Sequence, residues 1–183
     1  MALNVRDAQD GDAAAIAQVY RPYVEQSAAS FEDSAPDAVE MLGRMQAPPR
    51  LPWLVADADD RGVVGFAYAA KHRQRAAYRW SVDCSVYVAA DAQRWGVGRL
   101  LYGELFPLLA RLGYFRAYAG IAMPNPASVR LHESVGFEPV GVYRQVGYKQ
   151  GAWRDVGWWE LSLRAGVSPQ PPTEPTSWRP SDV

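Results

Sequence analysis

The sequence predicts a single α/β domain with a mixed sheet rather than an all-parallel one. Two observations indicate this: segments with strand and helix periodicity alternate along the chain, and hairpin-like pairs of strands occur near both ends. The chain has 183 residues, 49% of them hydrophobic, which is enough for one domain with a sizeable core. We expect the domain to span residues 1–164, and the Pro/Ser-rich residues 165–183 to form a flexible tail.

The N-terminal part predicts a short strand and two helices. Leu3–Arg6 is the strand. Pro22 falls inside the first helical pattern, and because proline lacks an N–H we expect a kink or a break there. The second helix begins with Pro36 at its first position. The apolar positions that define the two helices are Ile16, Val19, Tyr20 and Val24, and then Val39, Leu42 and Met45.

Residues 53–89 predict three strands. Residues 53–56 and 63–69 are joined by a polar, glycine-containing turn, which is typical of a hairpin. The basic loop 71–79 follows, and in it we place His72 at the surface. The third strand spans residues 80–89.

The second half predicts a helix, a strand, a helix and a final hairpin. Pro107 should bend the first, leucine-rich helix or cost it a hydrogen bond. The strand spans 115–123, the next helix runs from Pro126 to about residue 135, and the hairpin strands are 140–148 and 153–163. The last hairpin is rich in aromatic residues, and because large aromatic side chains dominate buried area we expect mostly core positions for Trp153, Trp158 and Trp159.

Composition excludes several classes of function. The net charge of -1 argues against broad attraction to nucleic acid or acidic membranes. Cys84 is the single cysteine, so neither an internal disulfide nor a cysteine-type metal site is expected. The sequence shows no signal peptide and no apolar run of about 20 residues. We therefore expect a soluble cytoplasmic protein without a metal.

A glycine-bearing turn lies between the predicted strand 80–89 and the leucine-rich helix. Its residues are Gln93, Arg94, Trp95, Gly96, Val97, Gly98 and Arg99. Free N–H groups and the dipole at a helix N-terminus favour a pyrophosphate, which glycines allow the main chain to approach. The alternative is a plain surface turn. The spacing Gln-x-x-Gly-x-Gly resembles the acyl-CoA pyrophosphate loop of the GCN5-related N-acetyltransferases (GNAT).

A second resemblance lies downstream. The segment 125–137, Asn-Pro-Ala-Ser-Val-Arg-Leu-His-Glu-Ser-Val-Gly-Phe, and the later Val146-Gly147-Tyr148 and Trp153-Arg154-Asp155-Val156-Gly157 are similar to phosphinothricin acetyltransferases. The resemblance covers residues 5–163. It implies a mostly antiparallel twisted sheet flanked by helices, acetyl-CoA as cosubstrate and direct transfer to the primary amine of a small molecule. It also implies a homodimer to which the last hairpin contributes, so a dimer interface is the second interpretation for its three tryptophans.

The resemblance also implies catalytic residues. An ammonium must lose a proton before it attacks a thioester, so a general base is required. The family places a Glu where this chain has Asp83, which is shorter by one methylene and would need burial to raise its pKa. The alternative for Asp83 is an ion pair with Arg75 or Arg79. His132 occupies the position of a proton donor for the CoA thiolate, although a structural histidine is equally compatible. We assign Cys84 to the core.

The remaining family positions concern binding. The backbone of Val86, Tyr87 and Val88 should meet the pantetheine arm, and Asn125 should bond it further along. Four residues match family positions that line the acceptor site: Phe31, Arg75, Tyr78 and Tyr87. The planar guanidinium of an arginine suits the paired oxygens of a carboxylate or phosphinate. The basic residues 71–74 differ from the herbicide-resistance enzymes, so methionine sulfone or sulfoximine are alternative acceptors.

Two further functions remain open on the sequence. One is acetylation of a protein N-terminus, against which the carboxylate-suited Arg75 argues. The other is a non-catalytic CoA-binding sensor, because Asp83 replaces the usual Glu. Release of free thiol across a panel of amines distinguishes them.

Overall fold

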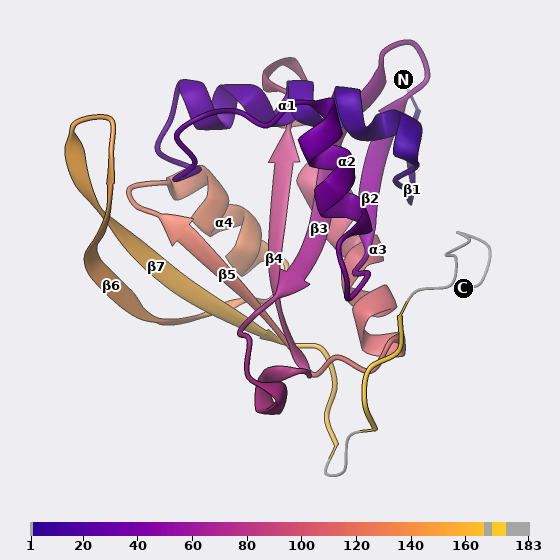
Figure 1. Ribbon diagram of the computed structural model, residues 1–183, viewed down its shortest axis with the longest axis vertical. Coiled ribbons are helices and arrows are strands. Elements are labelled where there is room, and N and C mark those ends of the chain that lie inside the picture. The colour runs from indigo at the N-terminus through magenta and orange to yellow at the C-terminus, as the bar shows by residue number, and fades with distance from the viewer. Residues whose placement is uncertain (1, 167–169, 175–183) are drawn as a thin grey trace.

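Seven strands form one sheet in the order β1-β2-β3-β4-β5-β7-β6, and every neighbouring pair is antiparallel except β4 and β5 (Figure 1). The computed structural model describes residues 2–166 and 170–174. The strands are β1 (Leu3–Asp7), β2 (Trp53–Ala58), β3 (Gly62–Lys71), β4 (Ser81–Val88), β5 (Arg116–Ala122), β6 (Glu138–Lys149) and β7 (Ala152–Ser162). The helices are α1 (Ala13–Glu25), α2 (Ala38–Gln46), α3 (Val97–Arg111) and α4 (Pro126–Ser134). The predicted mixed, mostly antiparallel α/β fold is confirmed.

Helices cover both faces of the sheet and bury two apolar clusters. On one face, α1 and α2 pack Ile16, Val24 and Met41 against side chains such as Phe66. On the other face, α3 packs against the sheet, with Leu105 among its fully buried leucines. Figure 1 shows α1 and α2 lying together across one side, with α3 behind the sheet. Because successive side chains of a strand point to opposite faces of the sheet, one strand can contribute apolar residues to both clusters.

The parallel pair β4–β5 is short and opens into a V. Only Ser81–Asp83 pair with Arg116–Tyr118, and beyond Asp83 the two strands diverge, as Figure 1 shows. Strand β5 is bonded to β7 along its other edge, and β4 to β3. The later part of β4 therefore has peptide groups that no neighbouring strand satisfies on the β5 side.

The expectations at the helix prolines hold only in part. Helix α1 continues through Pro22 to Glu25, so of the two alternatives there the break is wrong. Helix α3 runs through Pro107 to Arg111, where the missing proline N–H costs the helix one internal hydrogen bond, as expected. The buried faces of both helices outweigh one lost backbone hydrogen bond. Helix α2 begins at Ala38, after the cap formed by Asp37, so Pro36 precedes it.

Two predicted core positions are also wrong. Val39 is 78% exposed, since α2 buries Met41 together with the predicted Met45. Of the three C-terminal tryptophans only Trp159 is buried, whereas Trp153 is 61% exposed.

The C-terminal residues that the structure describes lie against the domain. The Trp80 indole donates to the Gln170 carbonyl (2.9 Å), and the Thr173 N–H donates to the Leu112 carbonyl (2.9 Å). The rest of the predicted tail, residues 167–169 and 175–183, lies outside the described residues. Within the described chain, no helix has the length and apolar character needed to cross a membrane.

Candidate active site

The predicted phosphate loop lies directly before α3. Gly96 caps the helix with a φ of +83°, a left-handed conformation that favours glycine. Its carbonyl accepts from the Leu100 N–H (3.0 Å), so the N–H groups of Val97, Gly98 and Arg99 have no partner within the helix. No side chain of the described residues caps this end. Three free donors and the positive end of the helix dipole therefore point to one place.

Gly98 has a different reason to be glycine. A Cβ at this position would lie 2.8 Å from Cδ2 of Leu131 on α4, so the glycine lets α3 and α4 approach closely. The sequence interpretation attributed this glycine to phosphate access alone. Packing between the two helices is the constraint that the structure adds.

A cavity of about 580 Å³ fills the V between β4 and β5 and reaches the loop. It brings together most of the predicted cofactor residues and His132. The predicted residues among its lining are Val86, Tyr87, Val88, Gln93, Arg94, Gly96, Val97, Gly98, Arg99, Asn125 and His132. The exception is Trp95, whose ring lies instead under the Arg61 guanidinium, 5.4 Å from it.

The peptide groups of β4 alternate between β3 and the cavity. The Ala89 N–H donates to the Val64 carbonyl on the β3 side, and the Trp80 carbonyl accepts from Phe115 on the β5 side. Alternation places the peptide groups of Val86 and Val88 on the cavity side and those of Tyr87 toward β3. The Tyr23 hydroxyl donates to the Val88 carbonyl (2.6 Å) and accepts from the Val88 N–H (3.2 Å). Val86 is thus the predicted residue whose N–H is free to face a ligand.

Asp83 lies at the apex of the V, where it is the last β4 residue paired with β5. Its Oδ1 is 2.6 Å from Nδ1 of His72, while its predicted alternative partners were Arg75 and Arg79. Burial raises the pKa of Asp83, and the hydrogen bond from His72, the charge of His72 and the charge of Arg73 oppose that rise. A raised pKa is what the proposed base needs.

The surface placement of His72 is wrong. Its side chain is only 12% exposed, and its ring stacks on Tyr118 at 4.4 Å. The register of β3 and β4 explains the contact: Ala70 lies opposite Asp83, so His72, two residues further, is a diagonal neighbour across the pair. The sequence pattern does not fix this register.

His132 is buried, with 4% exposure, and both ring nitrogens contact other residues. The Ser128 carbonyl can only accept, so Nδ1 carries a proton and donates to it (2.8 Å). Nε2 then accepts from the Tyr102 hydroxyl (2.9 Å). Burial lowers the pKa of His132, which keeps the ring neutral.

Cys84 is a core residue, as predicted. It is 3% exposed, and burial raises the pKa of its thiol. A thiol that resists ionisation is a poor nucleophile. Nor do the described residues contain a group of three or more His, Cys, Asp or Glu side chains that could hold a metal ion.

The predicted acceptor residues come from three elements. Tyr78 lies in a short 3₁₀ turn, Ala76–Tyr78, that Arg75 precedes, and its ring is 6.0 Å from that of His72. Tyr87 packs between Tyr20 (4.7 Å) and other aromatic rings on the α1 face. Phe31 lies over Gly147 of β6, where an added Cβ would overlap its ring.

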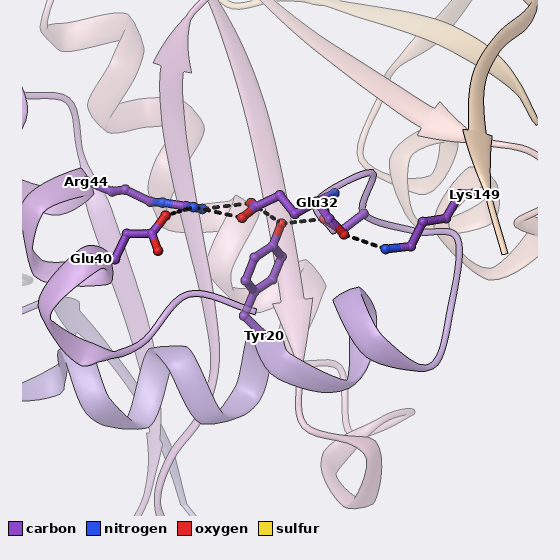
Figure 2. A network of polar contacts seen from close by, with 6 residues as sticks. Tyr20, Glu32, Glu40, Arg44 and Lys149 are labelled. Atoms are coloured by element: carbon purple, nitrogen blue, oxygen red, sulfur yellow. Dashed lines mark hydrogen bonds and ion pairs between the residues drawn. The ribbon is translucent and has the colours of Figure 1, made fainter. Parts of the chain in front are cut away.

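Residues beside Phe31 form a polar network that the sequence did not indicate (Figure 2). The Tyr20 hydroxyl donates to the Glu32 carboxylate (2.8 Å) and contacts the Ser30 hydroxyl (2.7 Å). Arg44 of α2 binds the same carboxylate, and the Lys149 ammonium donates to the Glu32 carbonyl. The loop that carries Phe31 is thereby tied to α1, α2 and β6.

Trp158 lies beside His72, a position that the sequence did not indicate. Its ring lies 6.2 Å from His72 with edge-to-face geometry, and the Arg73 guanidinium lies 5.5 Å above it. Its Nε1 is buried and has no hydrogen-bond partner among the described residues. An aromatic wall therefore borders the Asp83 side of the V.

Comparisons with known proteins agree with this geometry. A model of the acetyltransferase (GNAT) domain matches residues 5–158. Phosphinothricin N-acetyltransferase from Streptomyces viridochromogenes is 39% identical over 173 residues, covering 92% of each chain. The L-methionine sulfoximine/L-methionine sulfone acetyltransferase of Salmonella typhimurium is 34% identical over 168 residues, covering 91% of this chain and 98% of its own.

A solved structure is similar over nearly its whole length. A GNAT superfamily phosphinothricin acetyltransferase from Sinorhizobium meliloti, in complex with AcCoA, has a TM-score of 0.88 and 33% identity, covering 93% of this chain and 94% of its own. The chain belongs to the GNAT acetyltransferase family. It is therefore an acetyl-CoA-dependent N-acetyltransferase, and the family resemblance found in its sequence is confirmed.

Proposed function

We propose that this protein acetylates the primary amine of a small amino acid analogue, with phosphinothricin as the first acceptor to test. The observation that carries the proposal is the V between β4 and β5, whose cavity reaches the phosphate-binding start of α3 and whose apex carries the half-buried carboxylate of Asp83. Methionine sulfoximine or sulfone is the second candidate, because a relative 34% identical is named for those substrates.

The residues of the cavity fit acetyl-CoA. The unpartnered N–H groups of Val97, Gly98 and Arg99 suit its pyrophosphate, supported by the side chains of Gln93 and Arg94. The Val86 peptide group suits the pantetheine arm.

Asn125 would act further along the arm. Its Oδ1 already accepts from the Ser128 N–H (3.1 Å), so its amide N–H groups are the ones left for a ligand.

Asp83 supplies the proton-accepting group. When bound, acetyl-CoA supplies an acetyl thioester whose carbonyl carbon an amine can attack. Asp83 takes one proton from the acceptor ammonium, directly or through a water, and so frees the lone pair of nitrogen. The Val86 N–H lies on the cavity side, where it can donate to the carbonyl oxygen as negative charge develops there.

His132 relays a proton to the departing thiolate in this proposal. Because its resting ring is neutral, it first takes up the second proton that the acetylated nitrogen loses, and the imidazolium then donates a proton to the sulfur. His132 lines the same cavity as Val86, which supports the role. Because Nδ1 and Nε2 are both hydrogen-bonded within the protein, donation requires one of these bonds to open.

The acceptor lies on the Asp83 side, near Phe31, Arg75, Tyr78 and Tyr87. Arg75 is exposed, so its guanidinium is available to a phosphinate, a carboxylate or a sulfone-type oxygen pair. The aromatic rings would surround the short aliphatic chain of the substrate.

Thiol release from acetyl-CoA tests the function. We expect release with phosphinothricin, methionine sulfone or methionine sulfoximine. We expect Asp83→Asn to lower kcat by about 10² or more while leaving acetyl-CoA affinity unchanged. Two outcomes contradict the proposal: thiol release only with N-terminal peptides, and no thiol release with any amine of the panel. Near-normal turnover of Asp83→Asn contradicts the assignment of Asp83 as the base.

The edge strand β6 supports a homodimer. It ends the sheet, and the β6–β7 hairpin exposes apolar side chains that are each 51–62% accessible: Val140, Val142, Tyr143, Val146, Tyr148 and Trp153. Light scattering should give twice the chain mass, and Val142→Glu should give the monomer. Val39→Glu, at an exposed valine on α2, is the control that should remain dimeric. We also propose a cytoplasmic location, because acetyl-CoA is an intracellular metabolite.

A further inference from the structure

We propose that His72 is a positioning residue for this reaction, which holds one oxygen of Asp83 and leaves the other to take the proton of the amine. The inference rests on the proposed function and deepens it, because it adds a residue outside the family pattern found in the sequence. His72 belongs to the basic loop 71–79.

The contact between the two side chains is direct. Nδ1 of His72 and Oδ1 of Asp83 are 2.6 Å apart, a short hydrogen bond just below the roughly 2.7–2.9 Å of charge-assisted N–H···O bonds. An ionised carboxylate can only accept, so Nδ1 carries the proton and donates it. Oδ2 of Asp83 has no hydrogen-bond partner among the described residues and remains available to a substrate.

Aromatic neighbours hold the imidazole in place. The ring stacks on Tyr118 of β5 at 4.4 Å with 19° between the planes. The rings of Tyr78 and Trp158 face it edge-on at 6.0 and 6.2 Å. With stacking on one face and two rings at its edges, His72 cannot turn without breaking several contacts, so its N–H has a fixed direction.

The chemistry of Asp83 explains why a positioning group is useful. An Asp carboxylate lies one methylene nearer its own strand than a Glu carboxylate would. The orientation of the Asp83 carboxylate therefore decides whether it reaches the amine. General-base catalysis depends on reach first and on pKa second. A hydrogen bond that fixes Oδ1 therefore fixes the direction of Oδ2.

A histidine also suits this place better than the predicted arginine partners. A guanidinium is permanently charged and would strongly favour the ionised form of Asp83, which would weaken it as a base. An imidazole N–H can position the carboxylate and carries no permanent charge. Arg73 does lie nearby, but its Nη1 donates to the His72 carbonyl (2.8 Å) and its guanidinium lies over Trp158.

Two substitutions separate the hydrogen bond from the ring. His72→Asn keeps an N–H donor on the atom bonded to Cγ, as Nδ1 is, but loses the ring. His72→Phe keeps a ring that can stack on Tyr118 but has no donor. We expect H72F to lower kcat about tenfold or more. General-base catalysis contributes a rate enhancement of roughly 10²–10⁴-fold, and part of it is lost when the base is misoriented. We expect H72N to stay within about threefold of the parent, and KM for acetyl-CoA to be unchanged in both.

A double-mutant cycle tests whether His72 acts through Asp83. In the Asp83→Asn background, H72F should cause no further loss of kcat, because the group it positions is already gone. Thermal unfolding checks that each variant folds, and His72→Leu replaces H72F should the phenylalanine not fit.

Three results would overturn the inference. They are parent-like kcat in H72F, an equal loss of kcat in H72N and H72F, and a full additional loss from H72F in the Asp83→Asn background. Failure of the parent protein to acetylate any amine would instead contradict the proposed function, so the two failures are distinguishable.

Discussion

Arg44 and Glu32 form a bidentate ion pair that joins α2 to the loop after α1 (Figure 2). Nη1 and Nη2 of Arg44 donate to Oε1 and Oε2 of Glu32, each over 2.7 Å. Glu32 follows Phe31, the residue proposed to line the acceptor site. The pair therefore fixes the backbone beside a substrate contact, although neither side chain is expected to touch the substrate.

Replacing Arg44 should weaken acceptor binding. In Arg44→Met the Tyr20 hydroxyl is the one hydrogen-bond partner left to the Glu32 carboxylate among the described residues, and the loop that carries Phe31 becomes less ordered. A loss of about 1 kcal/mol of ordering corresponds to about fivefold in affinity. Steady-state kinetics should show KM for the amine rising about fivefold, with KM for acetyl-CoA unchanged.

A matched control is Arg21→Met. Arg21 lies on α1 and meets Glu25 at only 4.0 Å, with both side chains about half exposed, so its loss should leave both KM values unchanged. An Arg44→Met enzyme with the parent KM for the amine would show that the pair does not order the acceptor site.

The same pair makes stability depend on acid pH. The hydrogen bond from Arg44 lowers the folded-state pKa of Glu32, so at acid pH the unfolded chain binds a proton more readily than the folded one. This contribution is complete above the unfolded value of about 4.3 and is lost as pH falls through the folded value. Unfolding temperatures between pH 6 and pH 3 should fall less steeply in Glu32→Gln than in the parent. Equal slopes would mean that the ion pair is not coupled to folding.

The cap of α3 should control cofactor affinity. Gly96 has a φ of +83°, a region that costs a non-glycine residue about 1–2 kcal/mol and a β-branched one more. Gly96→Val must therefore move the loop and the N–H groups behind it, and titration calorimetry should show at least a tenfold rise in Kd for acetyl-CoA, equivalent to about 1.4 kcal/mol.

Gly103 provides the control within the same helix. An added Cβ there meets nothing within 4 Å, so Gly103→Ala should stabilise α3 by about 0.5–1 kcal/mol and leave Kd unchanged. Tight binding by Gly96→Val would contradict the assignment of this helix start to the pyrophosphate.

The cofactor half of the site could be predicted from the sequence because its chemistry is local. Residues 93–99 are consecutive, and a turn that opens a helix brings the same donors together wherever it occurs. The strands were found for the same reason, since alternation and turn residues are properties of short segments.

The other half depends on contacts between distant residues. Asp83 and His72 meet only because the β3–β4 register sets Ala70 opposite Asp83, and the basic composition of the loop concealed that pairing. Arg44 and Glu32 likewise meet through the packing of α2 on α1. Helical spacing alone could not show that α2 would bury Met41 and expose Val39, because the choice of face depends on the partner helix.

His132 should make stability fall as pH drops below neutrality. Burial lowers its folded-state pKa, whereas the unfolded chain takes up a proton near the ordinary histidine value of about 6.5. The unfolded state thus binds more protons, so stability is complete above about pH 6.5 and is lost as pH falls through that value toward the folded one. In His132→Gln the amide oxygen can still accept from the Tyr102 hydroxyl but does not titrate. The unfolding temperature of the parent should therefore fall more between pH 7.5 and pH 5.5 than that of His132→Gln, and parallel curves would show that His132 is not held neutral by the fold.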